Sequence, residues 1–287
     1  MRAITPILTL SALALGAGAG LSVAAAKISG PQRPVLDYAL TPYEVGVEAT
    51  DVRFTASDGT QLAGWWMDRP EATQVVVIAH GHRGSKSDML GIGPGLWRDG
   101  FAVLLFDFRG NGESADGPQS LAHYEQLDLS AAVDWVSEQR PDCEVDVIGF
   151  SMGAATSLLV AAQDESIAKV VADSPFADMT DVIAAAARQM KLPPVPLVGM
   201  VDRITGLRYG YRFDQVQPID VVDRIAPRPL MIVHGSADHV IPVEHARRLA
   251  ARAPGSRLEI VEGVDHCGGY FADRPGYIAR VAAFLRS

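Results

Sequence analysis

A serine framed by two glycines marks the stretch where chemistry is most strongly indicated. The motif Gly149-x-Ser151-x-Gly153 ends a short apolar run and precedes a small-residue segment, 154–162. Strand, sharp turn and helix in this order hold a nucleophilic serine on a tight, strained turn, so that its hydroxyl projects from the sheet edge. Backbone N–H groups at the start of the helix then face a developing negative oxygen. The alternative is a turn whose serine merely caps the helix.

The serine needs a base to remove its proton and a carboxylate to orient that base. His266 and Asp238 each follow an apolar run, at 258–261 and 230–234. Ligands of open α/β sheets bind at the carboxyl ends of strands, so these two side chains are expected at the same edge as Ser151. The chain order Ser151, Asp238, His266 is the one that this topology produces. Asp173, after another strand, is a rival carboxylate.

With these motifs the chain resembles the α/β-hydrolase superfamily, and is most similar to its small esterase and prolyl-oligopeptidase-like or serine-aminopeptidase-like branch. His80-Gly81-His82-Arg83-Gly84 matches the family's oxyanion segment, and residues 107–114 resemble its Asp-x-Arg-Gly-x-Gly-x-Ser stretch. The similarity runs from about Val45 to Ser287. It implies Ser151 as nucleophile, His266 as general base and then acid, and Asp238 as the orienting carboxylate. It also implies that the backbone N–H groups of Met152 and His82 hold the oxyanion.

Apolar strands alternate with helices along most of the chain, which predicts a mostly parallel sheet of about eight strands covered by helices on both faces, the α/β-hydrolase fold. The expected strands are 45–54, 62–67, 75–79, 102–106, 145–150, 170–173, 230–234 and 258–261. Only residues 176–222 break the rhythm, with a helical run at 183–190 stopped by Pro193-Pro194-Val195-Pro196 and a mixed apolar stretch after it. We interpret this insertion as a modest helical lid; the alternative is a packed surface excursion without a role in binding.

The N-terminus has the order of parts of a secretory signal peptide. Arg2 precedes an apolar segment, 4–21, and Ala24-Ala25-Ala26 offers a cleavage site, so residues 1–26 are a signal peptide or a retained membrane anchor. Either form predicts an extracytoplasmic protein that is secreted, periplasmic or membrane-anchored. Residues 27–42, rich in proline, are expected to be a linker, and 43–287 the hydrolase domain.

Several other ionisable residues have structural interpretations. We expect Cys143 and Cys267 to be free thiols, since they lie at opposite ends of the sheet. His80 is expected to brace the oxyanion loop and His234 to lie near the core. Surface positions are expected for His123, His239 and His245, and also for Arg83 and Lys86, although the last two would alternatively attract an acidic part of a substrate.

The preferred function is a serine hydrolase that cleaves carboxylic esters, or thioesters, through an acyl-enzyme, acting on a small-molecule ester or acyl substrate. The alternatives are a serine peptidase or aminopeptidase-like enzyme, a depalmitoylase-like enzyme, and a catalytically silent binding protein of the same fold. We expect no cofactor, and we expect no metal because the His, Cys and carboxylate residues lack the spacing of zinc ligands. The net charge of −9 without a basic stripe argues against a nucleic-acid partner. Membrane association is expected only through residues 1–26, and the sequence leaves the oligomeric state open.

Overall fold

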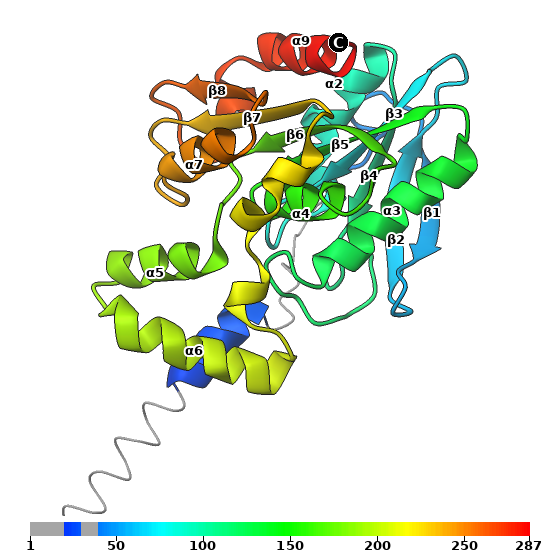
Figure 1. The fold of residues 1–287 in the computed structure, drawn as a ribbon. Helices are drawn as coiled ribbons and strands as arrows, with labels where there is room; N and C mark the ends of the chain where they lie inside the picture. Colours follow the sequence, from blue (N-terminus) through cyan, green and yellow to red (C-terminus); the bar gives the residue numbers. More distant parts are fainter. Residues whose placement is uncertain (1–19, 30–39) are drawn as a thin grey trace, which may run out of the picture.

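A central sheet organises the computed structural model, which describes residues 20–29 and 40–287. Its eight strands lie in the order β1-β2-β4-β3-β5-β6-β7-β8 (Figure 1). Their bounds are β1 Thr50–Thr55, β2 Gln61–Met67, β3 Gln74–Ala79, β4 Ala102–Asp107, β5 Glu144–Phe150, β6 Ile167–Asp173, β7 Leu230–Gly235 and β8 Arg257–Val261. The predicted strands are thus present, with shifts of a few residues at their ends.

The pairing of the strands follows their sequence character. β1 and β2 form an antiparallel hairpin whose turn contains Asp58 and Gly59, and β2 pairs antiparallel with β4. All later pairs are parallel. The central strands β3 to β6 are buried almost throughout, because a parallel sheet with helices on both faces needs apolar side chains on both sides.

Helices cover the two faces of this sheet. One apolar core joins α3 Glu125–Gln139, α4 Met152–Ala161 and α7 Glu244–Arg252 to the first face. A second core joins α2 Gly93–Arg98 and α9 Arg274–Leu285 to the other. The short elements η1 Lys86–Gly91 and α8 Gly269–Ala272 lie in loops that follow β3 and β8. The predicted mostly parallel sheet with helices on both faces is confirmed.

The lid segment, residues 176–222, leaves the sheet after β6 and returns to β7. It contains α5 Met179–Gln189 and α6 Pro194–Tyr209, followed by the short turns η2 Phe213–Gln215, η3 Pro218–Asp220 and η4 Val222–Ile225. Figure 1 shows α5 and α6 set apart from the sheet, below α4 and α7 in this view. The proline run was expected to interrupt helical structure, yet α6 begins within it. Proline fits the first turn of a helix, where its missing N–H would have no partner.

Residues 20–29 form a helix that lies beside α6 (Figure 1). Ala25 and Ser29 are fully buried, and the Ser29 hydroxyl lies 2.6 Å from that of Tyr211, which follows α6. The guanidinium of Arg83 donates to the carbonyl of Lys27. The helix therefore continues through the expected boundary between residues 26 and 27. Residues 1–19 of the expected signal or anchor, and 30–39 of the expected linker, lie outside the described residues.

Candidate active site

Ser151 stands on the turn between β5 and α4, in a conformation that strand–turn–helix geometry demands. Its backbone has φ 54° and ψ −113°, outside the favoured regions for a residue with a side chain. A Cβ added at Gly149 would lie 2.3 Å from the Gly153 carbonyl oxygen, and one at Gly153 would lie 2.3 Å from that of Ala79. Both glycines are therefore needed for close backbone approach. The Ser151 N–H donates to the Asp173 carbonyl at 2.9 Å, which ties the turn to β6.

The three residues singled out in the sequence meet at the carboxyl edge of the sheet. His266 Nε2 lies 2.9 Å from Ser151 Oγ, and His266 Nδ1 lies 2.7 Å from Asp238 Oδ2. Since an ionised carboxylate only accepts, Nδ1 carries the proton and Nε2 is free to accept from the serine hydroxyl. The side chain of His266 is 19% exposed whereas that of Asp238 is fully buried. A substrate can therefore approach the histidine and serine while the carboxylate stays shielded.

Asp238 is held as a carboxylate by several donors. Burial by itself would raise the pKa of Asp238, but hydrogen bonds from His234, His266 and the Ile241 N–H hold that pKa well below its usual range. Asp238 Oδ1 accepts from the N–H groups of Val240 and Ile241, each at 2.8 Å. The carboxylate therefore stays charged throughout the pH range in which the protein would work.

His234 also approaches this carboxylate, a contact that the sequence reasoning missed. Its Nε2 lies 3.2 Å from Asp238 Oδ2 and 2.8 Å from the Ile241 carbonyl oxygen, so both neighbours require a proton on Nε2. The side chain is fully buried, in agreement with the expected place near the core. The four-residue spacing between the strand-end histidine and Asp238 was the available signal.

The segment after β3 lies against the nucleophile turn. A Cβ added at Gly81 would lie 3.5 Å from the Ser151 Cβ, which places residues 80–82 next to the serine. His80 braces this segment as expected: its Nδ1 donates to the Gly81 carbonyl at 2.7 Å and its Nε2 accepts from the Phe108 N–H at 3.0 Å. Within the described part of the chain, neither the Met152 N–H nor the His82 N–H has a hydrogen-bond acceptor. These two amides, the predicted oxyanion donors, are thus available to a ligand.

Asp173, the rival carboxylate, supports the histidine loop from behind. It is buried and accepts from the Tyr277 hydroxyl at 2.8 Å and the Ser174 hydroxyl at 2.9 Å, and burial raises its pKa. Ser174 Oγ in turn accepts from the N–H of Cys267, the residue after His266, at 3.1 Å. Because the imidazole of His266 bonds Asp238, the Asp173 carboxylate is linked to the histidine loop through this chain of hydrogen bonds, whereas its backbone carbonyl accepts from the Ser151 N–H.

Lys86 was expected on the solvated surface, and that expectation is wrong. Its ammonium lies 2.6 Å from Asp107 Oδ2 and 2.7 Å from Glu113 Oε2, with only 4% of the side chain exposed. It also sits 4.6 Å above the centre of the Trp65 ring. Lys86 therefore joins the segment after β3 to the segment after β4, and is no free cation for an acidic substrate.

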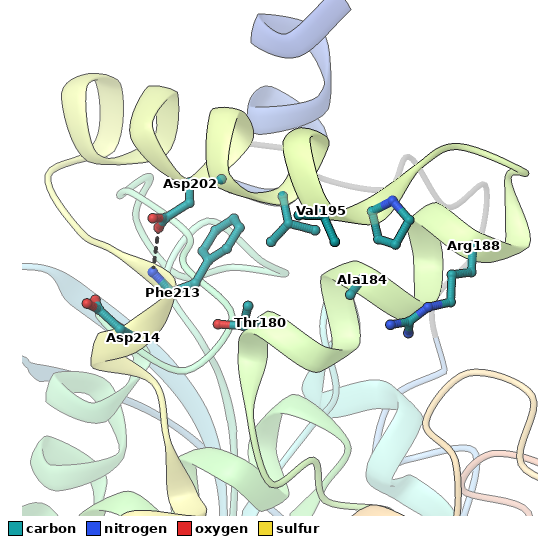
Figure 2. Close-up of a pocket in the computed structure, with 10 residues that line it drawn as sticks. Thr180, Ala184, Arg188, Val195, Asp202, Phe213 and Asp214 are labelled. Carbon is teal, nitrogen blue, oxygen red and sulfur yellow. Dashed lines mark hydrogen bonds between the residues drawn. The ribbon is translucent and has the colours of Figure 1, made fainter.

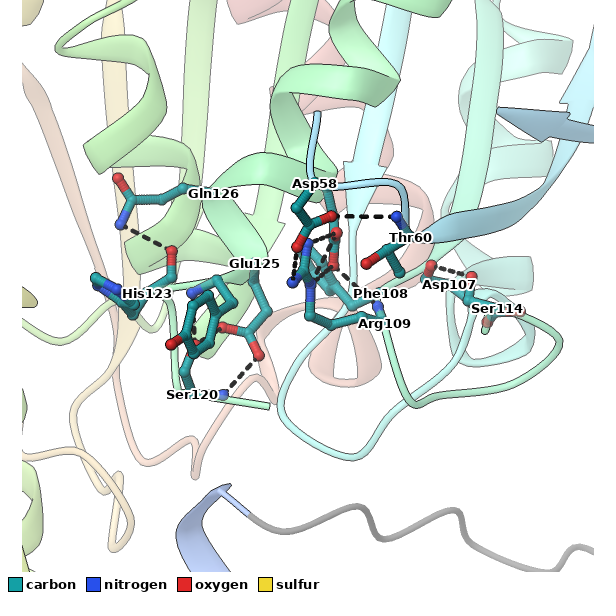
Figure 3. A network of polar contacts seen from close by, with 12 residues as sticks. Asp58, Thr60, Asp107, Phe108, Arg109, Ser114, Ser120, His123, Glu125 and Gln126 are labelled. Carbon is teal, nitrogen blue, oxygen red and sulfur yellow. Dashed lines mark hydrogen bonds and ion pairs between the residues drawn. The ribbon is translucent and has the colours of Figure 1, made fainter. Parts of the chain in front are cut away.

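Arg109 holds the neighbouring loop in the same way. Its guanidinium is fully buried and binds Asp128 of α3 and Asp58 of the β1–β2 turn, each with a contact of 2.7 Å. Figure 3 shows Arg109 beside Asp58, with Ser120 and Glu125 bonded to each other on the adjoining segment. Burial opposes the charge, but the two carboxylates raise the pKa of Arg109. This arginine therefore ties loops together, and its ion pairs position the loop that flanks His80.

The remaining histidines and cysteines differ in how well they were predicted. His239 is exposed as expected. His245 is buried instead, and its Nδ1 accepts from the Ala177 N–H at 3.1 Å. His123 is half-buried against the Tyr211 ring. Cys143 and Cys267 are free thiols, which confirms the prediction. Burial raises the pKa of the Cys267 thiol, so it does not compete with Ser151 as a nucleophile at neutral pH.

A cavity of about 320 Å³ lies between α5 and α6, away from the serine (Figure 2). Ala184, Val195, Val198 and Phe213 give it apolar walls, and Ser151 and His266 do not line it. Among residues 20–29 and 40–287, no cluster of three or more His, Cys, Asp or Glu side chains could hold a metal ion, and no helix is long and apolar enough to cross a bilayer. The chemical capacity of the site therefore resides in the Ser151–His266–Asp238 chain.

Comparison with protein families and curated proteins supports this architecture. Residues 74–195 match the model of a family described as alpha/beta hydrolase fold. The uncharacterised protein YfhR of Escherichia coli (strain K12) is 32% identical over 245 residues, which cover 81% of this chain and 78% of that protein. The uncharacterised protein YqkD of Bacillus subtilis is 29% identical over 244 residues, which cover 83% of this chain and 80% of that protein.

Among solved structures, the chain is similar to the Pyrococcus furiosus esterase PF2001. The TM-score is 0.74 with 28% sequence identity, over 89% of this chain and 96% of that one. The fungal alpha/beta hydrolase GrgF from Penicillium sp. sh18 aligns with a TM-score of 0.69 over 84% of this chain and 98% of that one, and at 23% identity this likeness concerns the fold.

Proposed function

This chain belongs to the α/β-hydrolase fold family, and from that premise we propose that it is a serine hydrolase that cleaves carboxylic esters of small molecules through an acyl-enzyme. One observation carries the proposal: the unbroken chain of hydrogen bonds from Ser151 Oγ through His266 to the Asp238 carboxylate. The structural similarity to the Pyrococcus furiosus esterase PF2001 favours an ester substrate over other acyl compounds. Thioesters react by the same steps and remain within the proposal.

Acylation begins when a substrate carbonyl carbon lies against Ser151 Oγ. His266 Nε2 accepts the hydroxyl proton as Oγ bonds to the carbon, and the imidazolium that forms is stabilised by Asp238. The carbonyl oxygen becomes an oxyanion, for which the Met152 and His82 amides are the proposed donors. When the tetrahedral intermediate collapses, His266 returns the proton to the leaving alcohol oxygen, and the acyl group stays on the serine.

Deacylation repeats these steps with water as the nucleophile. His266 Nε2 takes a proton from water while the oxygen attacks the acyl carbon, and then returns a proton to Ser151 Oγ as the acid leaves. The low pKa of Asp238 keeps the carboxylate charged, so the imidazole keeps its Nδ1–H and its orientation through both halves. Burial together with neighbouring Arg83 lowers the pKa of His82 to about 4, so the imidazole beside the oxyanion amide is neutral at pH 7.

The test is a substrate screen with p-nitrophenyl esters of increasing acyl length, run beside acyl thioesters and aminoacyl p-nitroanilides. We expect ester turnover to exceed anilide turnover and to fall by a factor of 1,000 or more, on the order seen for loss of a nucleophile, in Ser151→Ala. Higher anilide than ester turnover would replace the esterase with a peptidase. Equal turnover in wild type and Ser151→Ala would refute catalysis by this site and favour a binding protein.

We also infer that the chain acts outside the cytoplasm and keeps its N-terminal segment as an anchor. The packing of residues 20–29 supports retention, because cleavage after Ala26 would remove the fully buried Ala25 and the contacts of Leu21 and Ala24 with the core. The apolar sequence 4–21 supports the anchor. Cell fractionation with an antibody to the N-terminus tests this inference: an intact chain in the membrane fraction is expected, and a soluble cytoplasmic chain would contradict it.

A further inference from the structure

One helix face outside the proposed active site has a composition that a surface helix does not normally show. Residues 200, 203 and 207 of α6 lie on one side of the helix, opposite the buried residues Val198, Val201 and Thr205. On this side Leu207 is 90% exposed and Met200 is exposed as well, while Val195, which is 88% exposed, lies at the border with the cavity. The loop before α6 adds exposed Met190 and Leu192. We call Met190–Leu192 together with Met200, Arg203 and Leu207 of α6 the outer lid face.

Apolar side chains on both sides of a helix indicate a second apolar environment. A helix of a soluble domain usually buries one stripe and exposes polar residues on the other. α7 follows this rule: Glu244, Arg247 and Ala251 lie on its exposed side, and Ala246 and Leu249 are buried. α6 departs from it, since Val195, Met200 and Leu207 meet water. Exposed large apolar residues grouped on one face mark an interaction surface.

The charges on and beside this face are basic, although the chain as a whole carries a net charge of −9. Lys191 and Arg203 are exposed, and Arg208 is exposed next to Leu207. None of the three is paired with a carboxylate in the part of the chain that the structure describes. Asp202 is turned to the other side: it accepts from the Phe213 N–H at 2.8 Å, as Figure 2 shows, and pairs with Arg212.

The N-terminal segment leads to the same part of the molecule. The helix of residues 20–29 lies beside α6 (Figure 1), and the hydroxyls of Ser29 and Tyr211 form a hydrogen bond. The apolar sequence 4–21 runs into the first residues of this helix. A chain held in a bilayer by that sequence would keep α6 close to the lipid surface, because the intervening helix is packed on the domain.

We propose that the outer lid face lies on a bilayer that contains anionic phospholipids, with Met200 and Leu207 among the upper acyl chains and Lys191, Arg203 and Arg208 at the phosphates. Apolar residues flanked by lysine and arginine are the composition of helices that lie in the membrane interface. A second copy of this chain fits less well, because a twofold contact would bring the same cations against one another. The cavity of Figure 2 adjoins this face, since Val195 and Gly199 border it.

The experiment places an environment-sensitive fluorophore on the outer lid face of the full chain. Leu207→Cys and the control Ala251→Cys, on the exposed side of α7, are labelled with the same nitrobenzoxadiazole probe, and labelled wild type corrects for Cys143 and Cys267. Vesicles are phosphatidylcholine with or without phosphatidylglycerol. We expect a blue shift and a rise in emission at 207 with anionic vesicles, a smaller change with neutral vesicles, and none at 251.

Two results would overturn the proposal. One is a chain that sediments with anionic vesicles while the probe at 207 responds no more than the probe at 251, which would leave only the N-terminal sequence in the lipid. The other is a response at 207 that appears without vesicles and grows with protein concentration, which would identify a second copy as the occupant.

A charge reversal sharpens the test without touching the proposed catalytic residues. The variant is Arg203→Glu/Arg208→Glu with the probe at 207. We expect the concentration of anionic lipid needed for half the response to rise at least about tenfold, because each basic residue near the surface strengthens binding by up to about tenfold. The control Arg247→Glu on α7 should change it less than about twofold. Equal sensitivity of the two variants would contradict contact through the lid.

Discussion

The nucleophile turn and the lid segment are built in opposite ways. Around Ser151 the backbone is packed so closely that one added carbon atom at Gly149 or Gly153 would collide with a carbonyl oxygen. In the lid, Gly199 of α6 has no atom within 4 Å of such a carbon, and the helix exposes Val195 and Leu207. Close backbone packing is therefore found where atoms would react, whereas this part of the lid has open space and exposed apolar side chains.

The largest effect is expected at the inner end of the triad. Asp238→Asn should lower kcat for a p-nitrophenyl ester by a factor on the order of 10,000, because an amide no longer fixes the proton on His266 Nδ1 or stabilises the imidazolium. Steady-state kinetics measure this change, with circular dichroism as the control for folding. A loss below about tenfold would mean that the hydrogen bond of 2.7 Å between these side chains does not serve catalysis.

A matched pair of glycine substitutions tests the steric contrast itself. Gly153→Ala should lower the free energy of unfolding by about 3 kcal/mol and also reduce ester turnover, because its Cβ would lie 2.3 Å from the Ala79 carbonyl oxygen. Gly199→Ala, in the middle of α6, should raise it by up to about 1 kcal/mol, since alanine favours the helix and nothing obstructs it. Urea unfolding curves measure both free energies of unfolding, and similar losses of stability in the two variants would contradict the steric contrast between the nucleophile turn and α6.

The sequence predicted the tightly packed region almost to the residue. Gly149, Ser151 and Gly153 are needed for local steric reasons that a short motif records, and Asp238 and His266 follow strands whose apolar runs are plain. The structure brings these three polar side chains into contact as the motif order indicated. Their catalytic roles remain a prediction until kinetics test them.

The lid and the buried ion pairs were not predicted correctly, because they depend on contacts between residues that are far apart in the sequence. Pro194 reads locally as a helix breaker and becomes the first residue of α6. Lys86 is hydrophilic by type, but Asp107 and Glu113 meet it only after the chain has folded. His245 accepts a hydrogen bond from the N–H of Ala177, in the loop after β6, which is far from it in the sequence. No periodicity within a few residues carries such information.

A carboxylate buried in the strand that leads to Ser151 should affect stability without affecting chemistry. Burial raises the pKa of Asp146 from 3.8 to about 7. The folded state therefore holds a proton that the unfolded state has lost, so this contribution to stability is complete below pH 3.8 and disappears as the pH rises through about 7.

Asp146→Asn removes this dependence. Relative to wild type, the variant should gain about 4 kcal/mol in unfolding free energy between pH 4 and pH 8, with kcat unchanged. Urea titrations at the two pH values measure the gain, and an equal difference between wild type and variant at both values would contradict it.

The smallest effect is expected for the carboxylate behind the histidine loop. Asp173→Asn replaces one acceptor oxygen with an amide donor, which disturbs the hydrogen bond from Tyr277 or from Ser174. The Ser174 hydroxyl in turn accepts from the N–H of Cys267. We expect kcat to fall about tenfold with little change in KM, because the imidazole is displaced but still bonded to Asp238. A loss as large as that of Asp238→Asn would show that Asp173 is the orienting carboxylate after all.

The most direct test of the account is the site of covalent labelling by a fluorophosphonate, read by mass spectrometry of the digested protein. The account predicts one adduct, on the peptide that contains Ser151, formed far more slowly in His266→Ala and absent in Ser151→Ala. A folded wild-type chain that takes no label, or an adduct that persists when Ser151 is alanine, would contradict it.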